Sequence, residues 1–154
     1  MQRTLVIVKP DGVRRRLVGE ILARFERKGL EIVACRMMRI DTPLAERHYE
    51  IHKGRPFYPG LIRFMTSGAV VLAVVQGVAA VKVVRKMVGA TFGPEAEPGT
   101  IRGDFGMSRA FNLIHASDSP ETAEREVSLF FSPQEVLRSD PADERWIYDA
   151  EDLR

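Results

Sequence analysis

The chain has 154 residues, 45% hydrophobic and 29% charged, so it is long enough to bury a core and too apolar for a disordered chain. Its 23 Lys and Arg nearly balance its 21 Asp and Glu, and a net charge of +2 gives no reason to expect a nucleic-acid or membrane partner. The single Cys35 excludes an intrachain disulfide, and no apolar run reaches the roughly 18 residues of a membrane span. The N-terminal apolar run is too short for a signal peptide, so we expect a cytoplasmic protein. The length of the chain predicts one domain over residues 1–154.

The first half of the chain predicts two strands, each followed by helical sequence. The β-branched run 4–8 predicts a buried strand, which ends in the Pro- and Gly-containing turn 9–12. In segment 18–29, apolar residues recur at helical spacing and a Gly follows, which predicts a helix that ends at this Gly. Segment 30–40 predicts a second strand. Thr-Pro at the start of segment 42–53 predicts a helix N-terminus.

The second half predicts two further strands. Its expected elements are a loop at 55–60, a short helix at 61–65, a strand at 69–75, a helix at 78–88, a loop at 91–111, a strand at 113–116 and a helix from 119. Four strands separated by helical segments predict a sheet of about four strands, and we expect the helices to cover one face of this sheet. In the acidic segment 139–154, we expect Trp146, Ile147 and Tyr148 to fix part of the chain to the core.

Several common sites are absent from the sequence. No glycine-rich phosphate-binding motif and no paired cysteines occur. His48 and His52 have the i, i+4 spacing that can grip a metal, but a third ligand is not obvious. We therefore interpret them as solvent-facing or capping histidines.

His115 is a stronger candidate because it lies at the end of a short apolar strand, just before a helix. Histidines in such places also serve structural roles, so its position alone leaves both interpretations open. Strict alternation along a strand would put Asn112 and His115 on opposite faces. If both serve one site, the regular strand must begin after Asn112.

Basic residues are dispersed along the chain. Lys9, Arg85 and Arg102 lie at or near turns and helix ends, where they could face a common ligand. Any one of them could equally be a solvated surface charge. For the run Arg14-Arg15-Arg16 we expect solvated charges.

Four segments resemble the nucleoside diphosphate kinase family: 8–13 (VKPDGV), 55–57 (RPF), 98–105 (PGTIRGDF) and 112–119 (NLIHASDS). The resemblance runs in order from about residue 3 to Tyr148. It implies an α+β fold, with a ferredoxin-like, four-stranded antiparallel sheet and helices packed on it. It also implies ping-pong transfer of the terminal phosphoryl group from a nucleoside triphosphate such as ATP to a nucleoside diphosphate, which maintains NTP and dNTP pools. Mg²⁺ accompanies the nucleotide, and family members form homo-oligomers, hexamers or sometimes tetramers.

The same resemblance implies roles for individual residues. His115 matches the nucleophile, which attacks through Nδ1 in its neutral form. Glu126 matches the acid that orients the imidazole, Ser117 supports Glu126, and Tyr49 places a hydroxyl near the transferred group. Glu126 is also plausible from its position, on the predicted helix that follows His115.

The remaining matches are residues that bind the nucleotide. They are Arg85, Thr91 and Arg102 at the phosphates, Lys9 and Asn112 at the ribose hydroxyls and phosphates, and Phe57 and Leu61 at the base. Phosphoryl transfer spreads charge over the equatorial oxygens, so cations and positioning matter most. We expect no metal ligand among the protein side chains, and a base held by stacking should be accepted as purine or pyrimidine.

The chain departs from the family pattern at three places. Segment 91–94 (TFGP) displaces the usual proline by one position, in a loop that builds subunit contacts in the family. Arg109 replaces a small apolar residue on the other face of the base, where it could stack or turn to solvent. Residues 149–154 form a short extension without an assigned role.

Two other function classes compete with this prediction. A binding or regulatory protein could keep the fold without the activity, but every matched position retains the required residue type. An RNA-binding ferredoxin-like module would interleave aromatic and basic residues on central strands, and strands 4–8 and 69–75 carry neither.

Overall fold

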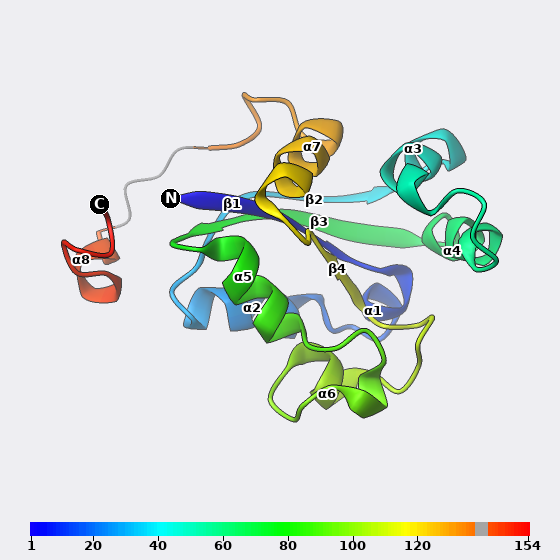
Figure 1. Cartoon of the computed structure of the whole chain (residues 1–154), viewed down its shortest axis with the longest axis horizontal. Helices are drawn as coiled ribbons and strands as arrows, with labels where there is room; N and C mark the ends of the chain where they lie inside the picture. Colours follow the sequence, from blue (N-terminus) through cyan, green and yellow to red (C-terminus); the bar gives the residue numbers. More distant parts are fainter. Residues whose placement is uncertain (138–141) are drawn as a thin grey trace.

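The computed structural model describes residues 1–137 and 142–154, and within them four strands form one antiparallel sheet (Figure 1). The strands are β1 (Gln2–Val8), β2 (Glu31–Arg39), β3 (Ala69–Gly77) and β4 (Ile114–Ala116). Their order across the sheet is β2-β3-β1-β4, and each neighbouring pair runs antiparallel. The predicted ferredoxin-like, four-stranded antiparallel sheet is confirmed.

Short and medium-length helices connect the strands. The helices in the described residues are α1 (Pro10–Arg14), α2 (Val18–Arg27), α3 (Thr42–His48), α4 (Tyr58–Met65), α5 (Ala80–Val88), α6 (Ile101–Phe105), α7 (Pro120–Phe130) and α8 (Glu144–Ile147), with 3-10 turns η1 (Glu50–His52) and η2 (Gly93–Glu95). Over the described part of the chain, none of these helices has the length and apolar character needed to cross a membrane.

Helices cover both faces of the sheet, so the expectation of one covered face is wrong. Leu5 and Ile7 of β1 pack with residues of α3, α4 and α7, whereas Val6 and Val8 pack with residues of α2, α5 and α6. Figure 1 shows these helices on either side of the strands. The physical reason is that β1 and β3 are apolar at successive positions, so both of their faces must be removed from water.

Two short helices form where the sequence predicted a turn and a loop. In α1, Pro10 stands at the start and Asp11 in the first turn, which favours helix initiation. In α6, the Thr100 side chain caps the helix by accepting a hydrogen bond from the Gly103 amide. Each helix has five residues, too few to be stable alone, so packing in the folded chain supports them.

Other helix boundaries shift by a few residues. The helix expected over 42–53 ends at His48, and η1 completes the segment. The one expected over 61–65 already begins at Tyr58. The α5 helix begins at Ala80 because Ala79 has a left-handed backbone, with φ of 50°.

The C-terminal segment contacts the rest of the chain through two of the three residues expected to anchor it. The Tyr148 hydroxyl accepts a hydrogen bond from the Val78 amide at 3.3 Å. Ile147 lies beside Gly29, where a Cβ atom would approach Ile147 Cγ2 to 2.7 Å and where φ is +90°. Trp146 is 81% exposed, so the prediction for this residue is wrong. The start of the predicted segment 139–154 falls partly on residues 138–141, outside the described residues.

Candidate active site

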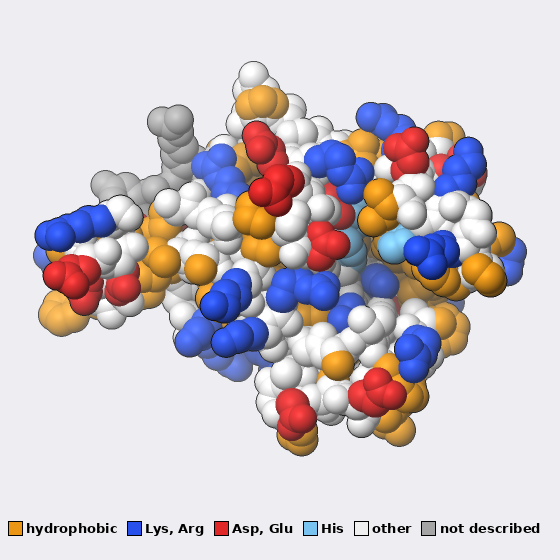
Figure 2. All heavy atoms as spheres, in the orientation of Figure 1, with side chains coloured by type: hydrophobic (Ala, Val, Ile, Leu, Met, Phe, Trp, Pro, Cys, Tyr) orange, Lys and Arg blue, Asp and Glu red, His pale blue; other side chains and the backbone are white. Residues whose placement is uncertain are grey.

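A cavity of about 1370 Å³ brings together residues from several separate segments between Lys9 and Glu126. Figure 2 shows a hollow between the α3–α4 side and the α6 side, with a histidine and several Lys and Arg side chains around it. All predicted site residues except Ser117 line the cavity: Lys9, Tyr49, Phe57, Leu61, Arg85, Thr91, Arg102, Asn112, His115 and Glu126. Ser117 is fully buried behind the cavity wall.

His115 lies in the middle of β4, half-buried, with its Nε2 atom 2.8 Å from Glu126 Oε2. Ser119 and Pro120 start α7 just after β4, and this helix carries the buried Glu126 back to the imidazole. Ser117 donates its hydroxyl to the same carboxylate oxygen at 2.7 Å. An Nε2–H that donates to Glu126 leaves Nδ1 as the basic nitrogen of His115.

Glu126 is held in its charged form. Burial alone would raise the pKa of this carboxyl, but the hydrogen bond and charge of His115 and the hydrogen bond of Ser117 outweigh burial and lower it. The carboxylate can therefore fix the orientation of the His115 ring and stabilise positive charge on it.

The sequence condition on Asn112 is met. Regular β4 begins only at Ile114, because Leu113 has a left-handed backbone with φ of 73°. Asn112 therefore turns into the cavity, where its Oδ1 accepts a hydrogen bond from Lys9 Nζ at 2.8 Å. Its Nδ2 donates to the Thr91 carbonyl at 3.3 Å, which joins β4 to the 91–111 segment.

Arg102 is the most firmly held cation of the site. It is only 4% exposed, and its guanidinium donates to the main-chain carbonyls of Asn112, Ile114 and Gly89 at 3.1, 2.6 and 3.1 Å. Burial, helped by the nearby Arg85, lowers its pKa to about 10, so it stays charged near neutral pH. Two of its five N–H groups remain to face an anion in the cavity.

Lys9 and Arg85 complete a cluster of positive charge beside His115. Burial, followed by the charge of Arg102, lowers the pKa of Lys9 to about 8. Arg85 extends from α5 and donates to the Ala116 carbonyl, next to His115, at 3.4 Å. Preorganised cations next to a nucleophile suit binding and transfer of a phosphoryl group. We call this part of the cavity the histidine end: Lys9, Arg85, Thr91, Arg102, Asn112, His115 and Glu126.

The opposite part of the cavity is lined by apolar rings and is more open. We call it the aromatic end: Phe57, Leu61, Phe64, Arg109 and Phe111. Phe57 is 53% exposed and lies 5.3 Å from the His52 ring, while Phe64 and Phe111 meet edge to face at 5.0 Å. Such surfaces suit a planar ligand held by stacking.

Arg109 lies over an aromatic ring of its own chain. Its guanidinium carbon lies 4.9 Å from the centre of the Phe92 ring, while the side chain stays exposed and lines the cavity. This contact is a cation–π contact within the chain, and the choice between stacking on the base and turning to solvent stays a prediction.

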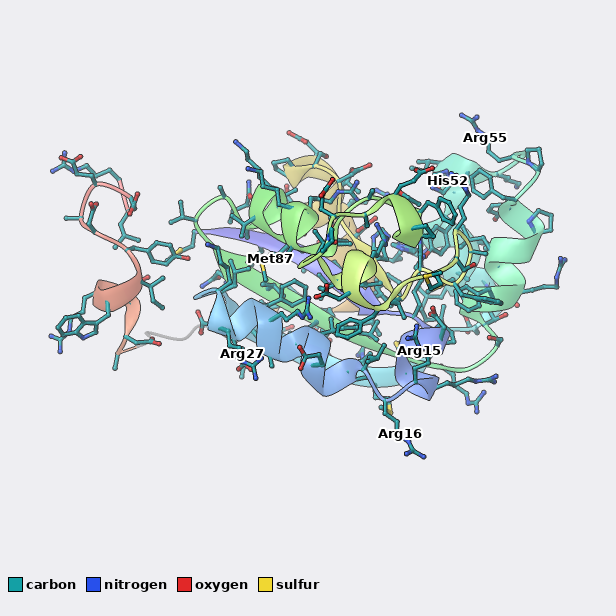
Figure 3. All side chains as sticks on the ribbon, turned by 90° about the horizontal axis from the view of Figure 1, so that it is seen from below. Arg15, Arg16, Arg27, His52, Arg55 and Met87 are labelled. Carbon is teal, nitrogen blue, oxygen red and sulfur yellow. The ribbon has the colours of Figure 1, made fainter. Side chains whose placement is uncertain are left out.

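The basic run 14–16 has a mixed outcome. Arg16 is exposed and, like Arg55, points away from the body of the protein (Figure 3). Arg14 and Arg15 are also exposed, yet they line the cavity and donate to the carbonyls of Ser67 and Phe105. Arg16 is a solvated charge, as expected. Arg14 and Arg15 are exposed too, but the sequence did not predict that they line the cavity.

His48 is the main residue that sequence reasoning missed. It is 2% exposed rather than solvent-facing, and its ring meets the His115 ring edge to face at 4.6 Å. The overlooked signal is that Ala45, His48 and Tyr49 follow the i, i+3, i+4 pattern of a buried helix face. Only His52, half-buried beside Phe57, remains near the surface.

The chemistry of these donors bears on metal binding. Possible ligand atoms of His48, His115 and Glu126 all lie within 4.8 Å of one another. Two nitrogens and one carboxylate do not suit Mg²⁺, which prefers oxygen ligands in an octahedral arrangement. A protein-held Mg²⁺ site does not fit this cluster.

Comparisons with known proteins agree with the geometry. A family model described as nucleoside diphosphate kinase matches residues 2–136. The chain is 57% identical to a nucleoside diphosphate kinase of Archaeoglobus fulgidus, over 97% of this chain and 99% of that protein. It is 59% identical to a nucleoside diphosphate kinase of Thermus thermophilus, over 89% of this chain and 100% of that protein.

A solved structure is also similar. The nucleoside diphosphate kinase of Halobacterium salinarum, determined in complex with CDP, superposes with a TM-score of 0.94 at 47% identity, over 96% of this chain and 99% of that one. The similarity in fold and in sequence extends over nearly the whole chain. The chain belongs to the nucleoside diphosphate kinase family.

Proposed function

We propose that the protein moves the terminal phosphoryl group between nucleotides by a ping-pong reaction through a phosphohistidine at His115. Family membership makes the chain a phosphotransferase that acts on nucleotides. The single observation that carries the mechanism is the 2.8 Å contact of His115 Nε2 with the buried Glu126, in the cavity that Lys9, Arg85 and Arg102 also line.

In the first half-reaction, Nδ1 of His115 forms a bond to the terminal phosphorus of a nucleoside triphosphate. The bond from that phosphorus to the bridging oxygen breaks, and the nucleoside diphosphate leaves with the electron pair. The imidazole becomes positively charged, and Glu126 stabilises that charge through the Nε2–H donor. In the second half-reaction, a terminal oxygen of another nucleoside diphosphate attacks the same phosphorus, and His115 leaves.

Each end of the cavity has a proposed part in binding. Arg85, Arg102 and Thr91 hold the phosphates, and the Tyr49 hydroxyl lies near the transferred group. Lys9 and Asn112 bind the ribose hydroxyls and phosphates. These residues line one continuous surface around His115, which supports the assignment.

At the aromatic end, the base stacks on Phe57 next to Leu61. An exposed ring offers surface rather than specific donors, so purines and pyrimidines should both bind. Mg²⁺ enters as part of the substrate, bound to the nucleotide phosphates.

We also propose a homo-oligomer, either a hexamer or a tetramer, in a reducing compartment such as the cytoplasm. Strand β2 lies at the sheet edge, where it pairs with β3 on one side, and its Met37 is exposed. Open edges and exposed apolar side chains favour contacts between chains. The free thiol of Cys35 suits a reducing environment. Light scattering after size exclusion measures the oligomer directly.

Phosphoenzyme formation tests the central proposal. After incubation with γ-labelled ATP, the protein should carry an acid-labile, base-stable label that any nucleoside diphosphate removes. His115→Ala should take up no label while still binding nucleotide. An unlabelled wild type, or a variant that is labelled normally, would refute the phosphohistidine and favour a binding protein that has kept only the fold.

A further inference from the structure

His48 occupies a buried position next to the reacting group, with no role in the function proposed above. It ends α3, and its ring packs edge to face against three others: Tyr49 at 4.3 Å, His115 at 4.6 Å and Phe130 at 5.2 Å. A ring in this position limits rotation of the His115 imidazole by contact alone. A phenylalanine would fill the same space.

Packing alone does not explain why residue 48 has a polar ring. Among the residues that the structure describes, neither of its buried ring nitrogens has a hydrogen-bond partner. Burial, followed by the neighbouring His115, lowers the pKa of His48 to about 3, so its ring is neutral and carries one N–H donor. A buried donor without an acceptor destabilises the folded state, so the polar ring has a cost that an apolar ring would avoid.

An acceptor for that donor lies close by. His48 Nδ1 is 3.9 Å from Glu126 Oε1, longer than a hydrogen bond by about 1 Å. The other oxygen, Oε2, already receives the donors of His115 and Ser117. The carboxylate thus has one oxygen fixed in place and one that faces His48.

We propose that His48 is a positioning residue: its Nδ1–H closes onto Glu126 Oε1 as positive charge develops on His115, so that Oε2 stays aimed at His115 Nε2. This inference rests on the proposed function of His115. A neutral donor suits the task because a cationic ring would compete with His115 for the negative charge of Glu126. His48 holds the carboxylate from one side, as Ser117 does from the other.

Three substitutions separate shape from polarity. His48→Phe keeps a ring and removes both nitrogens. His48→Asn places a polar atom near the position of Nδ1, whereas His48→Gln places one near Nε2. The proposal therefore predicts that Asn retains function and that Gln and Phe do not.

The first measurement is independent of catalysis. In a ¹⁵N-labelled protein, the ring nitrogen shifts of His115 report which nitrogen carries the proton. We expect the Nε2–H tautomer in the wild type and in His48→Asn, and a mixture of tautomers in the Phe and Gln variants. Unfolding midpoints serve as the control, and the Phe variant should be at least as stable as the wild type because it buries no unpaired donor.

The second measurement is single-turnover phosphorylation by ATP. His48→Phe should be phosphorylated about tenfold to a hundredfold more slowly, because a small misplacement of the nucleophile has a large effect on rate. Its ATP affinity should stay within about twofold, since His48 only positions another residue.

Two results would overturn the proposal. One is a His48→Phe variant with the wild-type His115 tautomer and the wild-type phosphorylation rate. The other is a His48→Gln variant that retains this tautomer and rate as well as His48→Asn does. If the Phe variant fails to fold, the comparison of Asn with Gln still decides. A wild type that takes up no label would instead refute the phosphohistidine, and the tautomer measurement would still test the contact between His48 and Glu126.

Discussion

The two ends of the cavity are built in opposite ways. At the histidine end, side chains are mostly buried and joined by hydrogen bonds: Lys9 to Asn112, Asn112 to the 91–111 segment, and Arg102 to three carbonyls. At the aromatic end, Phe57 and Phe111 are exposed, and aromatic rings contact one another in the pairs Phe57–His52 and Phe64–Phe111.

This difference follows from what each end must do. Phosphoryl transfer needs the nucleophile and the cations in one fixed geometry, which buried hydrogen-bond networks supply. A base held by stacking needs only a flat apolar surface, and such a surface tolerates different bases. Substitutions at the histidine end should therefore change rate and stability, while those at the aromatic end should change affinity.

The largest effect is expected for Arg102→Gln. Loss of its charge should lower kcat/KM by about a thousandfold, because a preorganised phosphate ligand is removed. The unpaired carbonyls should also reduce the free energy of unfolding by about 2–4 kcal/mol. Steady-state kinetics and urea unfolding measure both effects. Arg15→Gln is the stability control, since this exposed side chain donates to one carbonyl, and a similar loss there would contradict the special role of the buried arginine.

Glu126→Ala should slow phosphorylation without weakening nucleotide binding. We expect phosphorylation to slow by about a hundredfold, because the His115 ring loses the carboxylate that orients it and stabilises its charge. Nucleotide affinity, measured by calorimetry with the nonlabelled nucleotide, should be nearly unchanged. A large loss of affinity would mean that Glu126 contributes to binding rather than to orientation.

Lys9 makes the histidine end sensitive to pH. With its pKa lowered to about 8, its charge is lost as the pH rises through 8, so kcat/KM should fall above that pH by up to about tenfold per unit. The unfolded chain holds this proton up to about pH 10.5, so between pH 8 and 10.5 the unfolded state binds more protons and stability should rise with pH.

Two variants isolate this contribution. Lys9→Arg keeps its charge throughout the range and should lack the alkaline fall in kcat/KM. Lys9→Met should lack the stability increase between pH 8 and 10.5. Profiles identical to the wild type in both variants would assign the alkaline behaviour to another group.

The smallest effect is expected at the aromatic end. Phe57→Ala should raise KM by about tenfold, in line with the 1–3 kcal/mol typical of base stacking on an aromatic side chain. The change should be similar for ADP and CDP, with kcat unchanged, because stacking is equal in the ground and transition states. Phe57→Trp keeps a stacking surface and should bind normally. A loss confined to one base would show that this end recognises base edges.

Local patterns in the chain were enough to predict much of the protein. The apolar runs of β1 and β3, the helical period of α2 and the Ser119-Pro120 start of α7 are encoded within a few residues of each element. The motif around His115 led to the family and to a set of site residues. The one-domain organisation over residues 1–154, with 149–154 as an extension, stays a prediction.

Burial and partner choice depended on the folded chain, because they are set by residues distant in sequence. No local pattern could place His48 against His115, 67 positions further along the chain, or direct the Arg102 guanidinium to the carbonyls of Gly89, Asn112 and Ile114. The same holds for α1 and α6, which are too short to form without tertiary contacts. The sequence carries the chemistry of each side chain, and long-range packing sets the distances at which that chemistry can act.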